Sequence, residues 1–395
     1  MPATTQRGRL PASIWVLGFV SMLMDISSEL IHSLLPVFMV SVLGASMLTV
    51  GLLEGAAEAT ALVVRVFSGS LSDWMGKRKP VAILGYSLGA VTKPFFALAT
   101  SVEPIIAARL LDRVGKGLRA APRDALVADI TPPHLRGEAF GLRQSLDTTG
   151  AFIGPVLATL FMLLWANNIR AVFWVAVLPA FLCVALFIWG VQEPERPAGA
   201  ATVNPIRREN LVRLDARFWA VVALGGVFTL ARFSEAFLVL RAQDGGVPMA
   251  WIPLVLMAMN LIYAAGAYPM GKLADQMDHR LLLAIGLVLL IGADCALALF
   301  ATGPGFWLGI ALWGLHMAAT QGLLAAMVAD TAPADLRGTA YGFFNLVCGI
   351  ALLIASALAG WLWDTWGASV TFWSGAALAA AALLLVGFQR RTQPA

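Results

Sequence analysis

Long apolar segments recur along the whole chain, separated by short polar stretches. Each segment is long enough to cross a ~30 Å hydrocarbon core as a helix. Twelve of them are predicted, roughly at 12–40, 48–70, 80–100, 104–130, 138–165, 169–191, 214–241, 249–270, 280–301, 304–330, 338–363 and 369–388. Backbone groups in lipid must be hydrogen-bonded within the chain, and the alternating pattern of a membrane barrel is absent. The pattern therefore predicts an all-α membrane protein with twelve transmembrane helices.

The composition supports this prediction and excludes several classes of protein. Of 395 residues, 59% are hydrophobic and 13% are charged, against about 25% charged in a typical soluble domain. The three cysteines lie inside apolar runs, which does not favour a disulfide framework. Gly115-Lys116-Gly117 lacks the spacing of a phosphate-binding loop, and neither a Cys/His metal motif nor a nucleophile–base set is visible. We therefore expect no cofactor, no bound metal and no enzymatic activity.

Basic residues are concentrated in alternate loops, which predicts the orientation. The basic loops contain Lys77, Arg78, Lys79, Arg136, Arg196, Arg207, Arg208, Arg213, Arg217, Lys272, Arg280, Arg337, Arg390 and Arg391. The positive-inside rule assigns this side to the cytoplasm, so both termini are expected there. The rule also accounts for the net charge of +4 without nucleic acid.

The chain contains an internal repeat. Ala128-Asp129, Pro132 and Leu135-Arg136-Gly137 return 201 residues later, from Ala329 to Gly338. Ser28-Glu29 in the first span likewise has a counterpart in Ser234-Glu235 of the seventh. Two parallel repeats indicate a transporter with its substrate site between the halves. We predict six-helix bundles at 1–191 and 214–395, joined by a polar, proline-containing linker at 192–213.

One loop carries a recognisable motif. Between the second and third spans the sequence has Gly69, Asp73, Gly76, Lys77 and Arg78 at the spacing G-x-L-x-D-x-x-G-R/K-R/K. Its second copy keeps Gly271 and Asp275 but has Asp278 in place of the second glycine. With the repeat, this motif makes the chain resemble the major facilitator superfamily (MFS) over essentially its whole length. The resemblance implies the MFS fold and transport by alternating access.

Two further motifs refine the resemblance. The fourth span has Arg113 and Gly117 at the spacing of the family's Arg-x-x-x-Gly motif, surrounded by far more charge than usual. The fifth span has Gly150, Gly154 and Pro155, similar to the G-x-x-x-G-P motif of proton-coupled drug exporters, although the trailing glycines are missing. The glycines favour close helix approach and the proline a kink.

The signature loop is interpreted as a latch. Asp73 can pair with Lys77 or Arg78, and Asp129 ends the fourth span on the same side of the membrane. We expect this network to hold the two halves together when the protein opens outward and to break when it opens inward.

Charged residues inside the spans are the candidate coupling and cavity residues, because such groups normally have partners or face a cavity. Asp25, Glu29 and His32 share one face of the first span. Across the first half, six acids are balanced by six bases: Asp25, Glu29, Glu54, Glu58, Asp112 and Asp147, against Lys93, Arg109, Arg113, Lys116, Arg119 and Arg143. This near-neutral set is either a structural ion-pair lattice or a pathway for protons and substrate.

Within that set, individual roles differ. Asp25, near the middle of the first span, is the first candidate for a coupling carboxylate, followed by Glu29 and Asp112. Arg113 and Lys116 offer positive charge to an anionic substrate, or displace a proton from Asp25. Lys93 is expected to be structural, and His32 a hydrogen-bonded neighbour.

The second half is less charged. Arg232 and Glu235 are three residues apart and are expected to pair, while Trp313 and His316 share a face of the tenth span with Met317 and Gln321. A charged wall facing an apolar, aromatic wall suggests an amphipathic substrate. The alternative is that the aromatic side chains only pack helices.

The most favoured function is therefore proton-coupled efflux of a small amphipathic compound or drug from the cytoplasm through the inner membrane. Partners are expected to be the substrate, protons and lipid, with the protein acting as a monomer. A proton-symport importer, a metal-ion or metal-chelate exporter, a flippase-like lipid carrier and a non-transporting membrane sensor remain alternatives.

Overall fold

The computed structural model describes residues 10–194, 213–274, 276–333 and 336–389, and within these ranges it is built from helices without strands. The first half contains α1 (Ala12–His32), α2 (Leu35–Val37), the π-helical η1 (Phe38–Val42), α3 (Met47–Trp74), α4 (Lys79–Leu98), α5 (Val102–Ile130), η2 (Pro133–Leu135), α6 (Arg136–Leu164) and α7 (Ile169–Gly190). The second half contains α9 (Ala216–Leu230), α10 (Ala236–Asp244), η3 (Met249–Trp251), α11 (Pro253–Ala274), α12 (His279–Leu299), α13 (Gly303–Thr331), α14 (Arg337–Trp366) and α15 (Ala368–Gln389).

The predicted fold class is confirmed. Among the described residues, nine helices are long and apolar enough to cross a membrane. Ala216–Leu230 and Ala368–Leu384 are shorter apolar helices. α5 is long but rich in charged residues. Every one of the twelve predicted segments contains a helix or a broken pair of helices.

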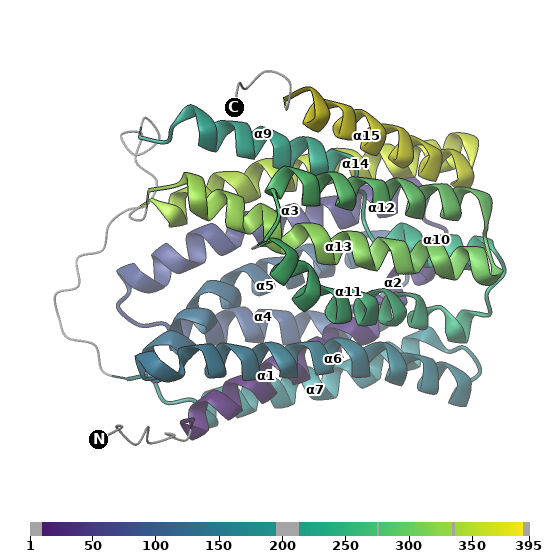
Figure 1. Cartoon of the computed structure of the whole chain (residues 1–395). Helices are drawn as coiled ribbons and strands as arrows, with labels where there is room; N and C mark the ends of the chain where they lie inside the picture. Colours follow the sequence, from purple (N-terminus) through teal and green to yellow (C-terminus); the bar gives the residue numbers. More distant parts are fainter. Residues whose placement is uncertain (1–9, 195–212, 275, 334–335, 390–395) are drawn as a thin grey trace, which may run out of the picture.

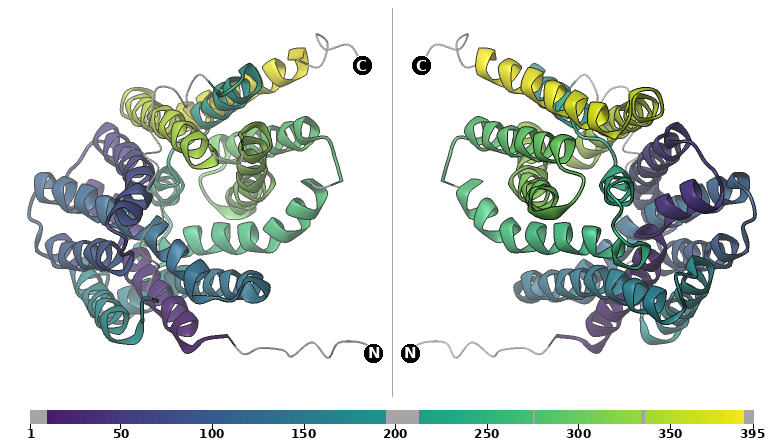
Figure 2. Two further views of the ribbon diagram at one scale, coloured as in Figure 1. Left: turned by 90° about the vertical axis from the view of Figure 1, so that its left-hand side faces the viewer. Right: turned by 90° about the vertical axis from the view of Figure 1, so that its right-hand side faces the viewer.

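The helices run roughly parallel to one axis, and the chain alternates between the two ends of the bundle (Figure 1). α1 begins and α15 ends at the same end, which we call the terminal end; the opposite end is the far end. Viewed along the axis, helices of the first half lie mostly on one side and those of the second half on the other (Figure 2). The halves meet where α3 packs against α14 and α6 against α11.

Small residues bring α3 and α14 close together. A Cβ added at Gly55 would lie 2.6 Å from the Cα of Leu353, and one at Gly342 would lie 2.9 Å from Val66 Cγ1. Neither position can carry a larger side chain without moving the neighbouring helix, because real Cβ atoms almost never approach so closely. Close backbone approach through small residues is the usual basis of helix packing in membranes, where lipid is as apolar as the helices.

Acidic or amide caps start several helices. Asn168 accepts a hydrogen bond from the Ala171 amide at 3.1 Å, and Asp215 accepts one from Phe218 at 2.9 Å. Asp278, which replaces the second glycine of the repeated loop motif, accepts one from the Arg280 amide at 2.8 Å and begins α12. Such caps satisfy amide groups that have no partner within the helix.

The sequence predicts the first span as one continuous helix, but the structure shows that it is broken. α1 ends at His32, a turn follows at 33–34, and α2 then leads into the π-helical η1. Pro36 lies in the first turn of α2. Its ring removes a backbone donor, so the helix cannot continue regularly through this position.

The predicted seventh span is also broken, between Leu230 and Ala236. Side chains replace the missing helical hydrogen bonds there. The Ser234 amide donates to Ser356 Oγ of α14 at 3.1 Å, and the Ala236 amide donates to Ser234 Oγ at 3.2 Å. The break is therefore held in a defined conformation by partners within the protein, as a non-helical segment at membrane depth requires.

Contacts between the two halves close the far end. Asp364, near the end of α14, accepts hydrogen bonds from the amides of Met47 at 2.9 Å and Leu48 at 2.8 Å. It thus caps the start of α3 from the other half of the chain, where the helix dipole favours a negative charge. Gln243 of α10 also donates to Ser41 across the same boundary.

We predict that Asp364→Ala weakens this closure. Loss of the cap should cost about 1–2 kcal/mol, which corresponds to about a 5- to 30-fold larger population opened at the far end. Val50 lies just inside the contact and is fully buried. A cysteine placed there, in a cysteine-free background, should be labelled faster by a water-soluble maleimide in the Asp364→Ala variant.

Asp244→Ala provides the control, because this carboxylate at the far end pairs with Arg241 of its own helix at 2.7 Å. Equal labelling rates with and without Asp364 would contradict the assignment of this residue to the closure.

Candidate functional site

The site is organised around α5, which is held tightly between two neighbouring helices. A Cβ at Gly115 would lie 2.7 Å from the Gly85 carbonyl of α4, and one at Gly117 would lie 2.9 Å from the Ala61 carbonyl of α3. Between these two contacts, Lys116 is left exposed. The two glycines therefore fix which face of α5 is packed and which face carries a free cation.

Two ion pairs join α5 to α3. Arg109 Nη2 lies 2.7 Å from Glu54 Oε2, and both side chains are almost completely buried. The same guanidinium nitrogen lies 2.8 Å from His32 Nδ1 of α1. One turn along α5, Arg113 Nη1 lies 2.9 Å from Glu58 Oε1. The acids and bases that share faces in the sequence are thus brought together.

A third pair joins α5 to α4. Lys93 Nζ lies 2.8 Å from Asp112 Oδ1, with both side chains buried, and it also donates to Ser28 Oγ of α1 at 3.3 Å. Arg113 Nε is 3.7 Å from the other oxygen of Asp112. Lys93 and Asp112 therefore connect three helices through one buried contact.

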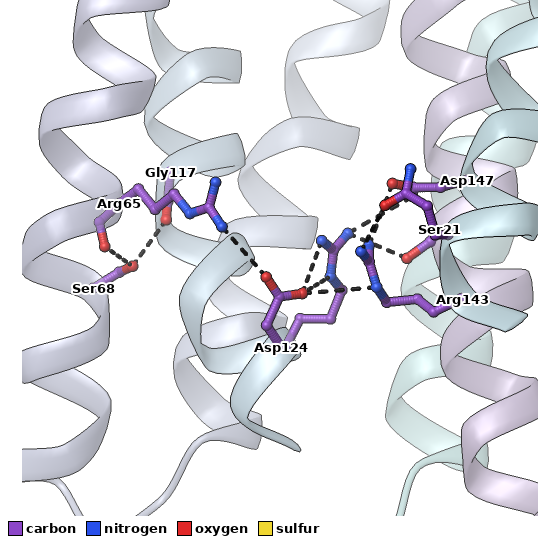
Figure 3. A network of polar contacts seen from close by, with 9 residues as sticks. Ser21, Arg65, Ser68, Gly117, Asp124, Arg143 and Asp147 are labelled. Carbon is purple, nitrogen blue, oxygen red and sulfur yellow. Dashed lines mark hydrogen bonds and ion pairs between the residues drawn. The ribbon is translucent and has the colours of Figure 1, made fainter. Parts of the chain in front are cut away.

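A second network lies nearer the terminal end (Figure 3). Asp124 of α5 lies between Arg65 of α3, at 3.4 Å, and Arg143 of α6, at 3.9 Å. It also pairs with the adjacent Arg123 at 3.1 Å. Arg143 in turn approaches Asp147 at 3.3 Å. This network ties α3, α5 and α6 together beyond the buried pairs.

Four of the twelve predicted intramembrane charges have no direct ion pair within the described ranges: Asp25, Glu29, Lys116 and Arg119. Asp25 faces Asp147 closely enough to share a hydrogen bond once one of the two carboxyl groups is protonated. Arg119 lies with its guanidinium 5.2 Å from the centre of the Tyr86 ring. One oxygen of Glu29 is buried without a hydrogen-bond partner.

The glycines of the fifth-span motif lie directly beside the two unpaired acids. A Cβ at Gly150 would lie 3.1 Å from Asp25 Cβ, and one at Gly154 would lie 2.6 Å from Glu29 Cβ. Pro155 lies within α6 next to this contact. The motif thus presses α6 against α1 at the level of Asp25 and Glu29.

The second half contributes the break in the seventh span and a cavity. Arg232 and Glu235 lie in the break, and Glu235 interacts electrostatically with Lys116 and Glu58 across the boundary between the halves. Tyr263 of α11 interacts with Arg232 and Glu235 and lines a cavity of about 650 Å³ between α11 and α13. The size is within the range of small-molecule sites.

One expectation for the second half is met only in part, and another does not hold. No ion pair or hydrogen bond joins Arg232 to Glu235 in the described part of the chain, because the break removes the helical spacing, but Arg232 is the charged group that acts most strongly on Glu235. Trp313 and His316 do not face a cavity, since both are fully buried. Trp313 packs against Phe233, and His316 bonds the Gly286 carbonyl at 2.8 Å.

The signature loop is placed only in part. Arg78 Nε lies 3.0 Å from Asp129 Oδ2, which ties the loop to α5 within the first half. Gly76 adopts a φ of +64°, a conformation that glycine accepts easily. Lys77 is exposed. The side chain of Asp73 and the whole of Asp275 lie outside the described residues, so the latch stays a prediction.

The sequence interpretation missed several polar residues. Asp124 and Arg65 join the terminal network, and Asp364 joins the halves. Asp294 of α12 is fully buried with neither carboxyl oxygen hydrogen-bonded. A single carboxylate within an apolar segment was the available signal for Asp294. In the described part of the chain, no group of three or more His, Cys, Asp or Glu side chains is placed to hold a metal ion.

Comparisons of the sequence with known proteins agree with this architecture. The model of the Major Facilitator Superfamily matches residues 17–351 and 236–395. An MFS-type transporter of Methanocaldococcus jannaschii is 33% identical over 385 residues, which cover 96% of this chain and 95% of that protein. Inner membrane transport protein YajR of Escherichia coli is 25% identical, over 93% of this chain and 80% of its own. Multidrug resistance protein MdtH of Photorhabdus laumondii is 26% identical, over 89% and 86%.

Solved structures share the fold at low sequence identity. The nucleoside transporter NupG superposes with a TM-score of 0.79 at 12% identity, covering 97% of this chain and 100% of that one. A D-xylose–proton symporter gives 0.72 at 17% identity, covering 94% and 96%. The family model and the archaeal relative span almost the whole sequence, and the fold is the same. The chain is therefore a multi-pass membrane transporter that belongs to the major facilitator superfamily.

Proposed function

We propose that this transporter exports a small amphipathic compound from the cytoplasm in exchange for protons. The observation that carries the proposal is the contact between the carboxyl groups of Asp25 and Asp147, on α1 and α6. Two carboxylates in contact repel each other when both are ionised, so the pair is suited to hold one proton. Arg143 and Arg123 lie on the Asp147 side at 3.3 and 3.8 Å and stabilise the remaining negative charge.

The unpaired charges support a coupling role for this region. Buried ionisable groups in a membrane protein normally have partners unless they act on a proton, an ion or a substrate. Glu29 lies one turn from Asp25 on α1 and interacts with the exposed Lys116 and with Glu235 of the second half. A proton or substrate that binds here acts on groups of both halves, as alternating access requires.

The cavity supports an amphipathic substrate. Its wall combines Tyr263, Tyr268 and Lys272 with alanine, glycine, leucine and methionine side chains of α11 and α13. Arg232 and Glu235 interact electrostatically with Tyr263, and Lys272 adds a charged group to the wall itself. A few polar groups on a mainly apolar surface are typical of small-molecule sites.

The direction of transport is the finer part of the proposal. Export is favoured by the sequence similarity to multidrug resistance proteins MdtH and by the glycines beside Asp25. We further propose that the protein lies in the inner membrane with its terminal end in the cytoplasm. The Arg78–Asp129 contact would then belong to a latch on the cytoplasmic side.

We predict that Asp25→Asn abolishes proton exchange without preventing folding. The test uses inside-out vesicles acidified by respiration and read with a pH-sensitive dye. Lipophilic cations, antibiotics, organic acids and divalent metals are added in turn. At least one lipophilic or amphipathic compound should release protons with the unaltered protein but not with Asp25→Asn, because an amide cannot carry the proton.

Glu103→Gln serves as the control, since Glu103 is an exposed carboxylate at the start of α5, outside both networks. Proton release that survives in Asp25→Asn would move the proton site to Glu29 or another acid. If none of the compounds causes the folded, unaltered protein to release protons, proton-symport import would be favoured instead.

The paired charges should behave differently from the unpaired ones. We predict that Glu54→Gln destabilises the protein by about 3–5 kcal/mol, because it leaves the Arg109 charge buried without its partner. Replacing both, as Glu54→Leu with Arg109→Met, should recover most of the loss, since an apolar pair needs no charge compensation. Thermal unfolding in detergent measures both variants.

Arg65→Gln is the matched control, because this arginine is half exposed and its pair with Asp124 should contribute less than about 1 kcal/mol. A double variant no more stable than Glu54→Gln alone would show that Glu54 and Arg109 do more than compensate each other's charge.

A further inference from the structure

Asp294 lies in the second half, on α12, in surroundings quite different from those of the other acids. Its side chain is fully buried, and neither carboxyl oxygen has a hydrogen-bond partner. Leu290, Ala293 and Leu297 of the same helix are also fully buried around it. Glu54, Glu58 and Asp112 of the first half, by contrast, each lie among several cations.

α15 packs closely against Asp294. A Cβ added at Gly375 of α15 would lie 2.6 Å from Asp294 Oδ2 and 3.0 Å from Phe233 Cε1. Gly375 therefore lies directly between the carboxyl group and the Phe233 ring. Only a residue without a side chain allows α15 to cover the carboxyl group at this distance.

Phe233 connects this site to the break in the seventh span. It is one of the non-helical residues between α9 and α10. Its ring centre lies 5.4 Å from Trp313, 5.5 Å from Phe237 and 5.4 Å from Phe372. We call Phe233, Phe237, Trp313 and Phe372 the aromatic cluster. Phe233 belongs to the break, so a movement of the break moves the ring that packs Gly375 against Asp294.

Charged groups on the neighbouring helices do not act on Asp294 within the described ranges. Arg241 of α10 lies one turn further along α12, where it donates to the Leu297 and Ala298 carbonyls and pairs with Asp244. His316 of α13 contacts α12 about two turns away, at Gly286. The adjacent Cys295 interacts electrostatically with Asp294.

We infer that Asp294 is a second proton-binding site, separate from the one in the first half and opened by the break between α9 and α10. An isolated carboxylate in apolar surroundings is strongly disfavoured, whereas the neutral acid is not. Asp294 therefore carries its proton while the aromatic cluster is closed. When Phe233 moves away from Gly375, water reaches the carboxyl group, which releases one proton to that water and becomes a carboxylate.

Infrared spectroscopy of the protein in lipid bilayers tests this inference without any transport assay. A protonated carboxyl group has a C=O stretching band distinct from those of a carboxylate. At neutral pH the unaltered protein should show such a band, and Asp294→Asn should lose the part of it that does not come from the Asp25–Asp147 pair. Asp25→Asn should keep the Asp294 band, and Asp244→Asn, which removes an acid already paired with Arg241, should leave it unchanged.

Gly375→Ala extends the test to a protein that keeps Asp294. The added methyl group must contact Oδ2, so the band should shift in frequency and exchange faster in D₂O, because the cover has been loosened. Phe233→Ala should also accelerate exchange. Retention of the full neutral-pH band in Asp294→Asn would overturn the inference. So would a band that neither shifts in Gly375→Ala nor exchanges faster in Phe233→Ala.

Discussion

Charged side chains inside an apolar bundle must find their partners within the protein, and most of this architecture follows from how α5 meets that requirement. Arg109 and Arg113 pair with two acids of α3, and Asp112 pairs with Lys93 of α4. Together with the hydrogen bonds of Arg109 to His32 and of Lys93 to Ser28 of α1, these pairs fix the rotation of α1, α3 and α4 about α5. Because separating any one of them leaves a buried charge without compensation, the first half is expected to move as one body.

The two halves are stabilised within the apolar membrane by different interactions. The first half carries an ion-pair lattice, and the charges left over include Asp25, which faces Asp147, and the exposed Lys116. The second half is held by aromatic packing and contains a break whose amides are satisfied by Ser234 and Ser356. A half tied together by ion pairs therefore faces a half in which one helix is broken and the break is held by side-chain hydrogen bonds.

Much of the fold could be predicted from the sequence, since apolar length and the internal repeat are enough for the helices and their order. The faces of α1, α3 and α5 also followed from helical spacing, so their acids and bases were expected together. Helical spacing gave no correct prediction where contacts between distant parts of the chain determine the structure. The break at Ser234 depends on Ser356, which is 122 residues away. The complete burial of Trp313 and the missing partner of Asp294 depend on how α12, α13 and α15 pack, which no local pattern contains.

The cap at the far end constrains the sequence of α14 more than the sequence of α3. Asp364 binds the backbone amides of positions 47 and 48, and any residue except proline offers the same amides there. The start of α3 can therefore diverge freely in sequence during evolution while the contact persists. Residue 364 has no such freedom, because it supplies the carboxylate. Within related chains, an acid at this position should therefore be inherited more faithfully than the residues it binds.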